Sequence, residues 1–201
     1  MLDKITAKYT AKESDAIRRV FEFAQAAHAG QKRHSGEDYI IHPLKVAEVL
    51  AEINMDYETV AAGLLHDVLE ETSYQAKDLE KEFGTNIAFL VGAVTKLHRV
   101  SYSGEKQYIE NLHKMILATA KDIRVVIIKL ADRLHNLETL DTYTGNKEKI
   151  AREALEIYAP LATRLGMGEI KGVLEDLAFP YVYPDDYAKL LAFVKNQIAE
   201  N

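Results

Sequence analysis

The sequence has no cysteine, no long hydrophobic run and no excess of basic residues, and each absence narrows the possible functions. With no cysteine among 201 residues, the chain forms no disulfide and no cysteine-ligated zinc site, which leaves histidine and carboxylate groups as metal ligands. This composition suits a cytoplasmic protein. No apolar run approaches a membrane span and residues 1–19 lack a signal-peptide core, so we expect neither.

The charge and the apolar content indicate the kind of partner. A formal net charge of −6 argues against nonspecific binding to duplex nucleic acid, but it is compatible with a local basic pocket for a small phosphorylated ligand. The hydrophobic content of 48% is enough for one good-sized domain with a substantial core. We therefore expect a globular protein with a small-molecule substrate.

Apolar residues recur at helical spacing along most of the chain. The stretch 123–137 is compatible with a buried strand over its first half, but its length and the continuing leucine spacing favour a central helix. We expect a loop at 97–107 and a kink at Pro160. The other predicted helices cover residues 17–28, 43–54, 61–71, 75–83, 87–97, 108–120, 150–165, 170–177 and 187–198. The predicted fold class is all-α, as a single helical domain.

The segment 61–72 carries the first candidate chemistry. If residues 61–71 are helical, a rotation of about 100° per residue places four polar side chains within one arc of about 140°. These are His66, Asp67, Glu70 and Glu71. An imidazole and three carboxylates on an otherwise apolar helix are costly to desolvate unless they are paired or bind a cation. The segment therefore predicts a metal site.

Two more residues complete the candidate ligand set. His42 precedes Pro43 at a predicted helix start, and Asp132 is a carboxylate in the middle of the predicted central helix. With His66 and Asp67 they supply two imidazoles and two carboxylates, a shell suited to Mn²⁺, Fe²⁺, Co²⁺, Zn²⁺ or Mg²⁺. Four protein ligands on an ion that prefers six leave positions for water and a phosphate oxygen.

The order His, His-Asp, Asp is that of the HD phosphohydrolase superfamily, and the flanking segments narrow the resemblance. Over about residues 15 to 190, the chain resembles the N-terminal hydrolase domain of the RelA/SpoT (Rel) alarmone family. The segments that carry the resemblance are RHSGEDYIIHPL at 33–44, HDVLEET at 66–72, VTKL at 94–97, KLADRLHN at 129–136 and IYAPLATRLG at 157–166.

The resemblance implies Mn²⁺-dependent removal of the 3′-pyrophosphate from (p)ppGpp, the alarmone of the stringent response, giving GDP or GTP and pyrophosphate. By the same resemblance, the metal ligands are His42, His66, Asp67 and Asp132. Glu70 and Glu71 correspond to an acidic pair that orients or deprotonates the attacking water. The implied substrate contacts are Arg33, Ser35, Asn136, Thr139 and Arg152.

Three positions depart from the family pattern. Glu71 stands where the family usually has Asp, His34 where it often has Lys, and Glu138 where it often has Arg. These changes predict a weaker positive field around the substrate and a less favourable second carboxylate. Two alternatives therefore stay open: an HD phosphohydrolase for another nucleotide, and a catalytically weakened regulatory domain of a bifunctional Rel protein (GTP pyrophosphokinase).

The resemblance also implies a domain organisation. Residues 1–180 correspond to the hydrolase domain, and residues 181–201 to a C-terminal helix like the connector that precedes a synthetase domain in long members. The chain is then either a hydrolase domain of a bifunctional enzyme or a stand-alone small alarmone hydrolase. The remaining histidines are expected on the surface or as hydrogen-bonded core residues; among them are His28, His98, His113 and His135.

Overall fold

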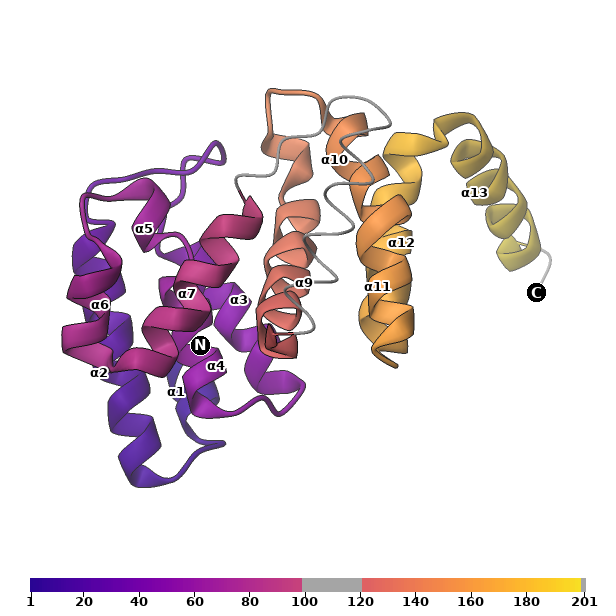
Figure 1. The fold of residues 1–201 in the computed structure, drawn as a ribbon. Coiled ribbons are helices and arrows are strands. Elements are labelled where there is room, and N and C mark those ends of the chain that lie inside the picture. Colours follow the sequence, from indigo (N-terminus) through magenta and orange to yellow (C-terminus); the bar gives the residue numbers. More distant parts are fainter. Residues whose placement is uncertain (99–120, 200–201) are drawn as a thin grey trace. The chain divides into compact units, whose positions relative to one another are not determined.

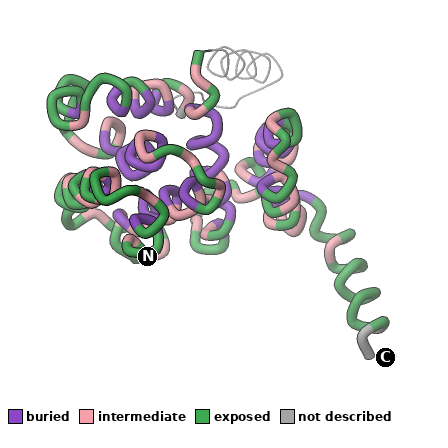
Figure 2. The backbone as a smooth tube through the Cα atoms, turned by 90° about the horizontal axis from the view of Figure 1, so that it is seen from below, coloured by how far each residue is buried: buried purple, intermediate pink, exposed green. Residues whose placement is uncertain are grey.

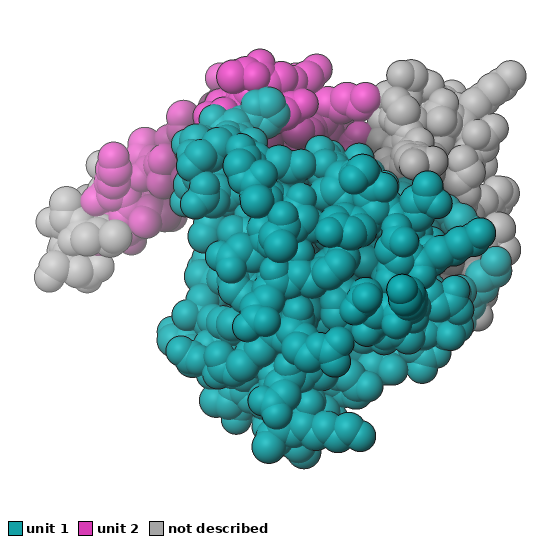
Figure 3. Space-filling model, turned by 90° about the vertical axis from the view of Figure 1, so that its left-hand side faces the viewer, with its two compact units in different colours: residues 1–135 teal, residues 136–201 magenta. Residues whose placement is uncertain are grey.

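The computed structural model describes residues 1–98 and 121–199, and helices make up most of these ranges (Figure 1). The only β pairing among them is an isolated bridge between Lys32 and Asp38. The prediction of an all-α fold is confirmed. The chain divides into two compact units, Met1–His135 and Asn136–Asn201, which Figure 3 colours separately. No helix in the described part of the chain has both the length and the apolar character needed to cross a membrane.

The first unit holds the helices around which the candidate site is built. They are α1 (Leu2–Thr6), α2 (Ala11–Ala27), α3 (Ile41–Glu52), α4 (Tyr57–Leu65), α5 (Val68–Glu71), α6 (Ala76–Phe83), α7 (Thr85–His98) and α9 (Ile123–Glu138), which continues three residues into the second unit. Polar caps fix several starts: Thr10 and Glu13 form a capping box at α2, and the Asp56 side chain accepts the Thr59 amide at α4.

Helices α3 and α4 approach closely because Gly63 has no side chain. A Cβ atom on Gly63 would lie 2.5 Å from Cδ1 of Leu50 and 3.5 Å from Cγ1 of Val46, both on α3. Gly63 and Leu50 are buried, as is most of the interior of this unit (Figure 2). The close approach places His42 on α3 near His66, the residue that directly follows α4; their ring centroids are 5.0 Å apart.

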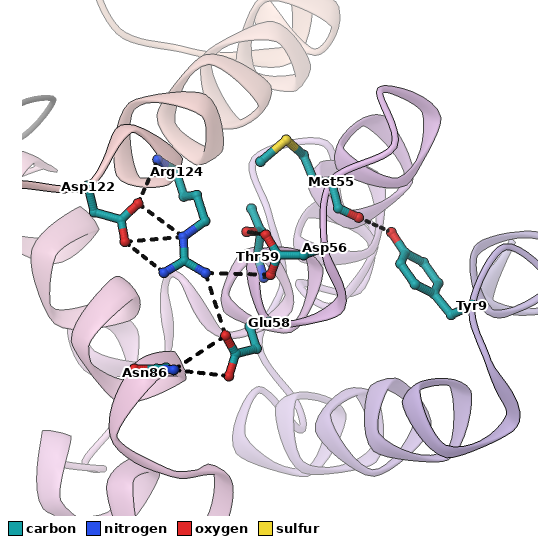
Figure 4. A network of polar contacts seen from close by, with 8 residues as sticks. All are labelled: Tyr9, Met55, Asp56, Glu58, Thr59, Asn86, Asp122 and Arg124. Atoms are coloured by element: carbon teal, nitrogen blue, oxygen red, sulfur yellow. Dashed lines mark hydrogen bonds and ion pairs between the residues drawn. The ribbon is translucent and has the colours of Figure 1, made fainter.

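A polar network joins the start of α9 to the start of α4 (Figure 4). The Arg124 side chain bonds to the Asp122 carboxylate, with Nε 3.0 Å from Oδ1. Its Nη1 lies 3.6 Å from Asp56 Oδ1 and 3.5 Å from Glu58 Oε2. Asn86, near the start of α7, donates to the same Glu58 carboxylate. The network therefore fixes the helix that carries Asp132 against the helix that ends at His66.

The prediction of one continuous helix over 61–71 is wrong, because the chain turns at His66 and Asp67 between α4 and α5. The reason lies in the side chain of His66, whose Nδ1 is 2.8 Å from the Gly63 carbonyl oxygen. In a continuing helix that carbonyl would accept the amide of Asp67. The hydrogen-bond ladder restarts at Asp67, whose carbonyl accepts the amides of Glu70 and Glu71.

The helix predicted over 123–137 is confirmed as α9, which excludes the strand alternative for that stretch. The predicted helices at 17–28, 43–54, 75–83 and 87–97 correspond to α2, α3, α6 and α7. The loop predicted at 97–107 and the helix predicted at 108–120 lie almost entirely outside the described residues.

The second unit combines short helical segments with two longer helices, α12 and α13. They are η1 (Leu140–Thr142), α10 (Lys147–Glu153), η2 (Ala154–Tyr158), α11 (Ala159–Arg164), α12 (Gly168–Val182) and α13 (Pro184–Ala199). The helix predicted over 150–165 corresponds to the contiguous run of α10, η2 and α11, and its irregularity is the π-helical turn η2 just before Pro160. Pro160 lies in the first turn of α11, where its missing amide leaves the preceding turn free to widen.

Candidate metal centre

The four predicted metal ligands converge within the first unit. His42 comes from α3, His66 and Asp67 from the turn between α4 and α5, and Asp132 from α9. The possible ligand atoms of His42, His66 and Asp67 all lie within 4.8 Å of one another. Asp132 Oδ1 lies 3.2 Å from Nε2 of His42 and 3.8 Å from Nε2 of His66. All four side chains are buried.

The spacing of these atoms fits one shared divalent ion. Two donors that each lie about 2.1 Å from an ion are about 3.0 Å apart at an octahedral angle and about 3.4 Å apart at a tetrahedral angle. Besides the two Asp132 distances, His66 Nε2 is 3.1 Å from Asp67 Oδ1, and His42 Nε2 is 3.6 Å from Asp67 Oδ2. The donor set and its spacing therefore suit a divalent metal.

A hydrogen bond to the backbone orients the ring of His66 in a way that suits a metal ligand. Its Nδ1 donates to the Gly63 carbonyl oxygen, because a carbonyl can only accept. Its Nε2 is buried and has no hydrogen-bond partner among the described residues. A buried ring nitrogen without a partner, facing two carboxylates, is the arrangement that a bound cation completes.

His42 is held by a second histidine. The Nδ1 atoms of His42 and His135 lie 2.8 Å apart, across 93 positions of sequence. When the proton of neutral His42 is on Nδ1, that atom donates to Nδ1 of His135, and the lone pair of Nε2 is available to a metal. When the proton is on Nε2, that atom donates to Asp132 instead. Burial lowers the pKa of His42. Burial, with the nearby His42 and Arg33, lowers the pKa of His135 to about 3. Both rings are therefore neutral at pH 7, as metal binding requires.

Each candidate carboxylate also has a partner on the oxygen that faces away from His66. Lys129 Nζ donates to Oδ2 of Asp132, and the Tyr39 hydroxyl donates to Oδ2 of Asp67 at 2.9 Å. Burial and the Asp67 carboxylate raise the pKa of Tyr39, so the hydroxyl stays a donor.

The two carboxylates remain ionised although they are buried. For Asp132 the burial effect is outweighed, chiefly by Lys129, and the pKa is held well below its usual value. For Asp67 the pKa is also lowered although burial opposes this, because positive charge on His66 or His42 favours the ionised form. With both imidazoles neutral, the Lys129 ammonium and the hydrogen bond from Tyr39 are the groups that stabilise the Asp67 carboxylate. Two carboxylates and one lysine ammonium leave one negative charge in this buried cluster, which a divalent cation more than neutralises.

The other site residues predicted in the first unit lie on either side of these ligands in sequence. Glu70 and Glu71 form the end of α5, with Glu70 partly buried and Glu71 exposed. Arg33 and Ser35 lie in the turn between Lys32 and Asp38, and the Arg33 guanidinium carbon is 5.8 Å from the centre of the Tyr39 ring. The Ser35 hydroxyl donates to Glu37 at 3.2 Å.

Three predicted substrate contacts belong to the second unit. They are Asn136, Thr139 and Arg152. Arg152 pairs with two carboxylates on its own side of the helical segment, 2.6 Å from Glu148 and 3.7 Å from Glu156. The roles of these three residues toward a nucleotide stay predictions.

The sequence-based prediction did not include three residues that contact the candidate ligands: Tyr39, Lys129 and His135. Helical spacing in the sequence already places Lys129, three residues before Asp132, near the face of that carboxylate, and the same spacing applies to His135, three residues after it. Tyr39 carried no such signal, because its contact with Asp67 depends on the path of the loop before α3.

Comparison with known proteins identifies the family. The protein-family model described as "HD domain" matches residues 20–168. The chain belongs to the HD domain family. The predicted resemblance to RelA/SpoT proteins is confirmed by the relatives of this chain. The chain is 49% identical over 195 residues to "Guanosine-3′,5′-bis(diphosphate) 3′-pyrophosphohydrolase" from Aquifex aeolicus, and the match covers 96% of this chain and 28% of that protein.

Two further matches bear on this HD domain. It is 49% identical over 181 residues to "Bifunctional (p)ppGpp synthase/hydrolase SpoT" from Escherichia coli K12, covering 89% of this chain and 26% of that protein. The chain thus spans less than a third of the length of these curated relatives. A solved structure, described as a metazoan ortholog of SpoT that hydrolyzes ppGpp, matches with a TM-score of 0.58 and 27% identity, covering 84% of this chain and 95% of that one.

Proposed function

We propose that this HD domain is a (p)ppGpp 3′-pyrophosphohydrolase that uses a divalent ion, with Mn²⁺ as the ion, and that it acts in the cytoplasm in the stringent response. The observation that carries the proposal is the convergence of two histidine Nε2 atoms and two ionised carboxylates in one buried cluster. The activities for which the relatives are named supply the substrate.

In the proposed reaction, water attacks the phosphorus attached to the ribose 3′ oxygen, the P–O3′ bond breaks, and the 3′ oxygen takes up a proton. The products are pyrophosphate and GDP or GTP. When bound, the metal ion supplies Lewis-acid polarisation of a phosphoryl oxygen and lowers the pKa of a water. His42, His66, Asp67 and Asp132 would hold the ion. Each keeps a fixed orientation because a second group holds its other polar atom.

The candidate general base comes from the acidic pair on α5. Glu70 and Glu71 follow Asp67 directly in the short helix that it starts, and Glu70 is the less exposed of the two. A carboxylate in this position would take the proton of the attacking water as the new bond forms. Arg33 and Ser35 would contact the nucleotide, with the planar guanidinium of Arg33 available to stack on the guanine.

The proposal extends to a longer protein. The relatives are several times longer than this chain, and one of them, from Streptomyces coelicolor, is named "GTP pyrophosphokinase" and is 52% identical over 179 residues. We propose that residues 1–180 form the hydrolase domain and that residues 181–201 lead toward a synthetase domain in a full-length protein.

The direct test is pyrophosphate release from ppGpp by the purified chain, with Mn²⁺, with Mg²⁺ and with a chelator. GTP and dGTP serve as substrate controls. We expect release from ppGpp with Mn²⁺ and none from the controls. Equal rates on dGTP would favour the alternative of an HD phosphohydrolase for another nucleotide. Binding of ppGpp without turnover would favour a regulatory domain, for which Glu71 in place of Asp is the motivating residue.

A further inference from the structure

The loop before α3 is attached at two points to the segment that carries the candidate metal ligand and the acidic pair. At one point, the Tyr39 hydroxyl donates to Oδ2 of Asp67 at 2.9 Å. At the other, the side-chain amide nitrogen of Gln31, Nε2, donates to the backbone carbonyl oxygen of Glu71 at 2.7 Å. The loop also carries Arg33 and Ser35. The residues proposed to contact the nucleotide and those proposed for the chemistry are thus joined within the first unit.

His28, at the end of α2, holds both attachment residues. Its ring stacks on the ring of Tyr39, with centroids 4.6 Å apart and an interplanar angle of 16°. Its Nδ1 is 2.8 Å from Oε1 of Gln31. Because the side-chain Nε2 of Gln31 donates to the Glu71 carbonyl oxygen, Oε1 of Gln31 is left as an acceptor, and His28 Nδ1 is therefore the donor to it. His28 is buried at 3% exposure, so it fixes the two residues to the body of the unit.

Tyr39 has two separable contacts. Its hydroxyl bonds to Asp67, and its ring lies 5.8 Å from the guanidinium carbon of Arg33, within the range of a cation–π interaction. The hydroxyl thus orients a candidate metal ligand, and the ring supports a candidate nucleotide contact.

We propose that Tyr39 is a positioning residue with two roles: its hydroxyl fixes Asp67 for metal binding, and its ring fixes Arg33 for the guanine nucleotide. The inference rests on the proposed function for its second role only, because the first concerns metal affinity alone. Partners on the outer side of metal ligands fix their orientation, and their loss weakens metal binding. A residue that serves both roles couples the loop to the metal centre.

Two variants separate the roles. Tyr39→Phe removes the hydroxyl and keeps the ring, so we expect the Kd for Mn²⁺ to rise about 10-fold or more, with KM for ppGpp at saturating Mn²⁺ within about twofold of wild type. Tyr39→Leu removes both, so we expect the same loss of Mn²⁺ affinity and an additional rise in KM of about two- to fivefold. Calorimetric titration with Mn²⁺ alone gives Kd, and pyrophosphate release gives KM.

Tyr9→Phe is the matched control, because it removes a hydroxyl hydrogen bond of 2.7 Å to the Met55 carbonyl oxygen in the same unit. Its Kd and KM should equal those of wild type. Unfolding temperatures in chelator show whether each variant folds, and a purely structural role of Tyr39 would lower that temperature without changing Kd or KM.

The outcomes are distinct. If Tyr39→Phe binds Mn²⁺ with the same Kd as wild type, the proposed role of the hydroxyl is overturned. If the two Tyr39 variants have equal KM values for ppGpp, the proposed role of the ring is overturned. If wild type binds Mn²⁺ but leaves ppGpp intact, the proposed function fails while the Mn²⁺ titration still decides the first role. If wild type binds no Mn²⁺, both proposals fail.

Discussion

The two compact units treat polar groups in opposite ways. In Met1–His135, six titratable side chains that belong to or contact the candidate centre are no more than 7% exposed: His42, His66, Asp67, Lys129, Asp132 and His135. Among the described residues of Asn136–Asn201, no charged side chain is buried. Instead, this unit exposes large apolar side chains on α13, with Phe193 at 62%.

The contrast shows where the chemistry resides. Burying charges costs several kcal/mol per ion unless partners compensate. Among the described residues of the first unit, the buried charged side chains Asp67, Lys129 and Asp132 all belong to one cluster. The second unit has an ordinary apolar interior with buried residues such as Ile157 and Leu174. The candidate metal centre is thus formed by residues of the first unit alone.

The largest expected effect comes from removing a metal ligand. His66→Ala should abolish Mn²⁺ binding and turnover together, a loss greater than the about 10- to 100-fold that follows loss of an outer partner. Titration with Mn²⁺ and pyrophosphate release measure the two effects. Tyr181→Phe, which loses a hydrogen bond to Asp141 in the second unit, should change neither. If His66→Ala still bound Mn²⁺, the assignment of the metal centre to this cluster would be wrong.

Replacing the acidic pair should affect turnover without affecting the metal. The double variant Glu70→Gln and Glu71→Gln keeps the shape of both side chains but removes the candidate base, so we expect the rate to fall about 10²- to 10⁴-fold. The Kd for Mn²⁺ should stay close to that of wild type. Near-normal turnover in the double variant would show that neither carboxylate takes the proton.

Lys129→Met tests the charge balance of the buried cluster. Without the ammonium, Asp132 keeps a buried charge that lacks its main partner, so the free energy of unfolding in chelator should fall by about 3 kcal/mol. Saturating Mn²⁺ should restore more stability to this variant than it adds to wild type. Denaturant unfolding in chelator and in Mn²⁺ gives both values.

The matched control for Lys129 is Lys189→Met, which breaks an exposed pair with Asp186 in the second unit and should cost nothing measurable. If Lys129→Met were no less stable than Lys189→Met in chelator, the pair with Asp132 would not carry the balance of charge.

The smallest expected effects concern the second unit. Asn136→Ala should raise KM for ppGpp about tenfold, the order expected for a lost hydrogen bond to a charged group, with the Kd for Mn²⁺ unchanged. Arg152→Gln should have a smaller effect, because Arg152 is already paired with Glu148 and Glu156. Steady-state kinetics at saturating Mn²⁺ measure both. A change in Mn²⁺ affinity in either variant would contradict the claim that residues of the first unit alone form the metal centre.

The sequence predicted the elements of the fold better than their interruptions. The leucine spacing of α9 and the Pro43 helix start were sufficient for the helices that carry Asp132 and His42. The turn at His66 and Asp67 was missed because the residues on both sides remain apolar, and the interruption comes from one side-chain hydrogen bond to Gly63. Such a local competition between side chain and backbone leaves no trace in the hydrophobic pattern.

The same limit applies to the candidate site. Residue type and order indicated the four candidate ligands, but the pairing of His42 with His135 joins positions 93 residues apart. The hydrogen bond from Tyr39 to Asp67 depends on the turn between Lys32 and Asp38. Contacts of this kind follow from tertiary packing, so only the structure reveals which side chains orient the ligands.

The most direct test of the metal centre is the anomalous diffraction of a crystal of this chain that contains Mn²⁺. The account predicts one anomalous peak within bonding distance of Nε2 of His42, Nε2 of His66 and the carboxylates of Asp67 and Asp132. A peak elsewhere, or full loading of the crystal with no peak at this cluster, would contradict it.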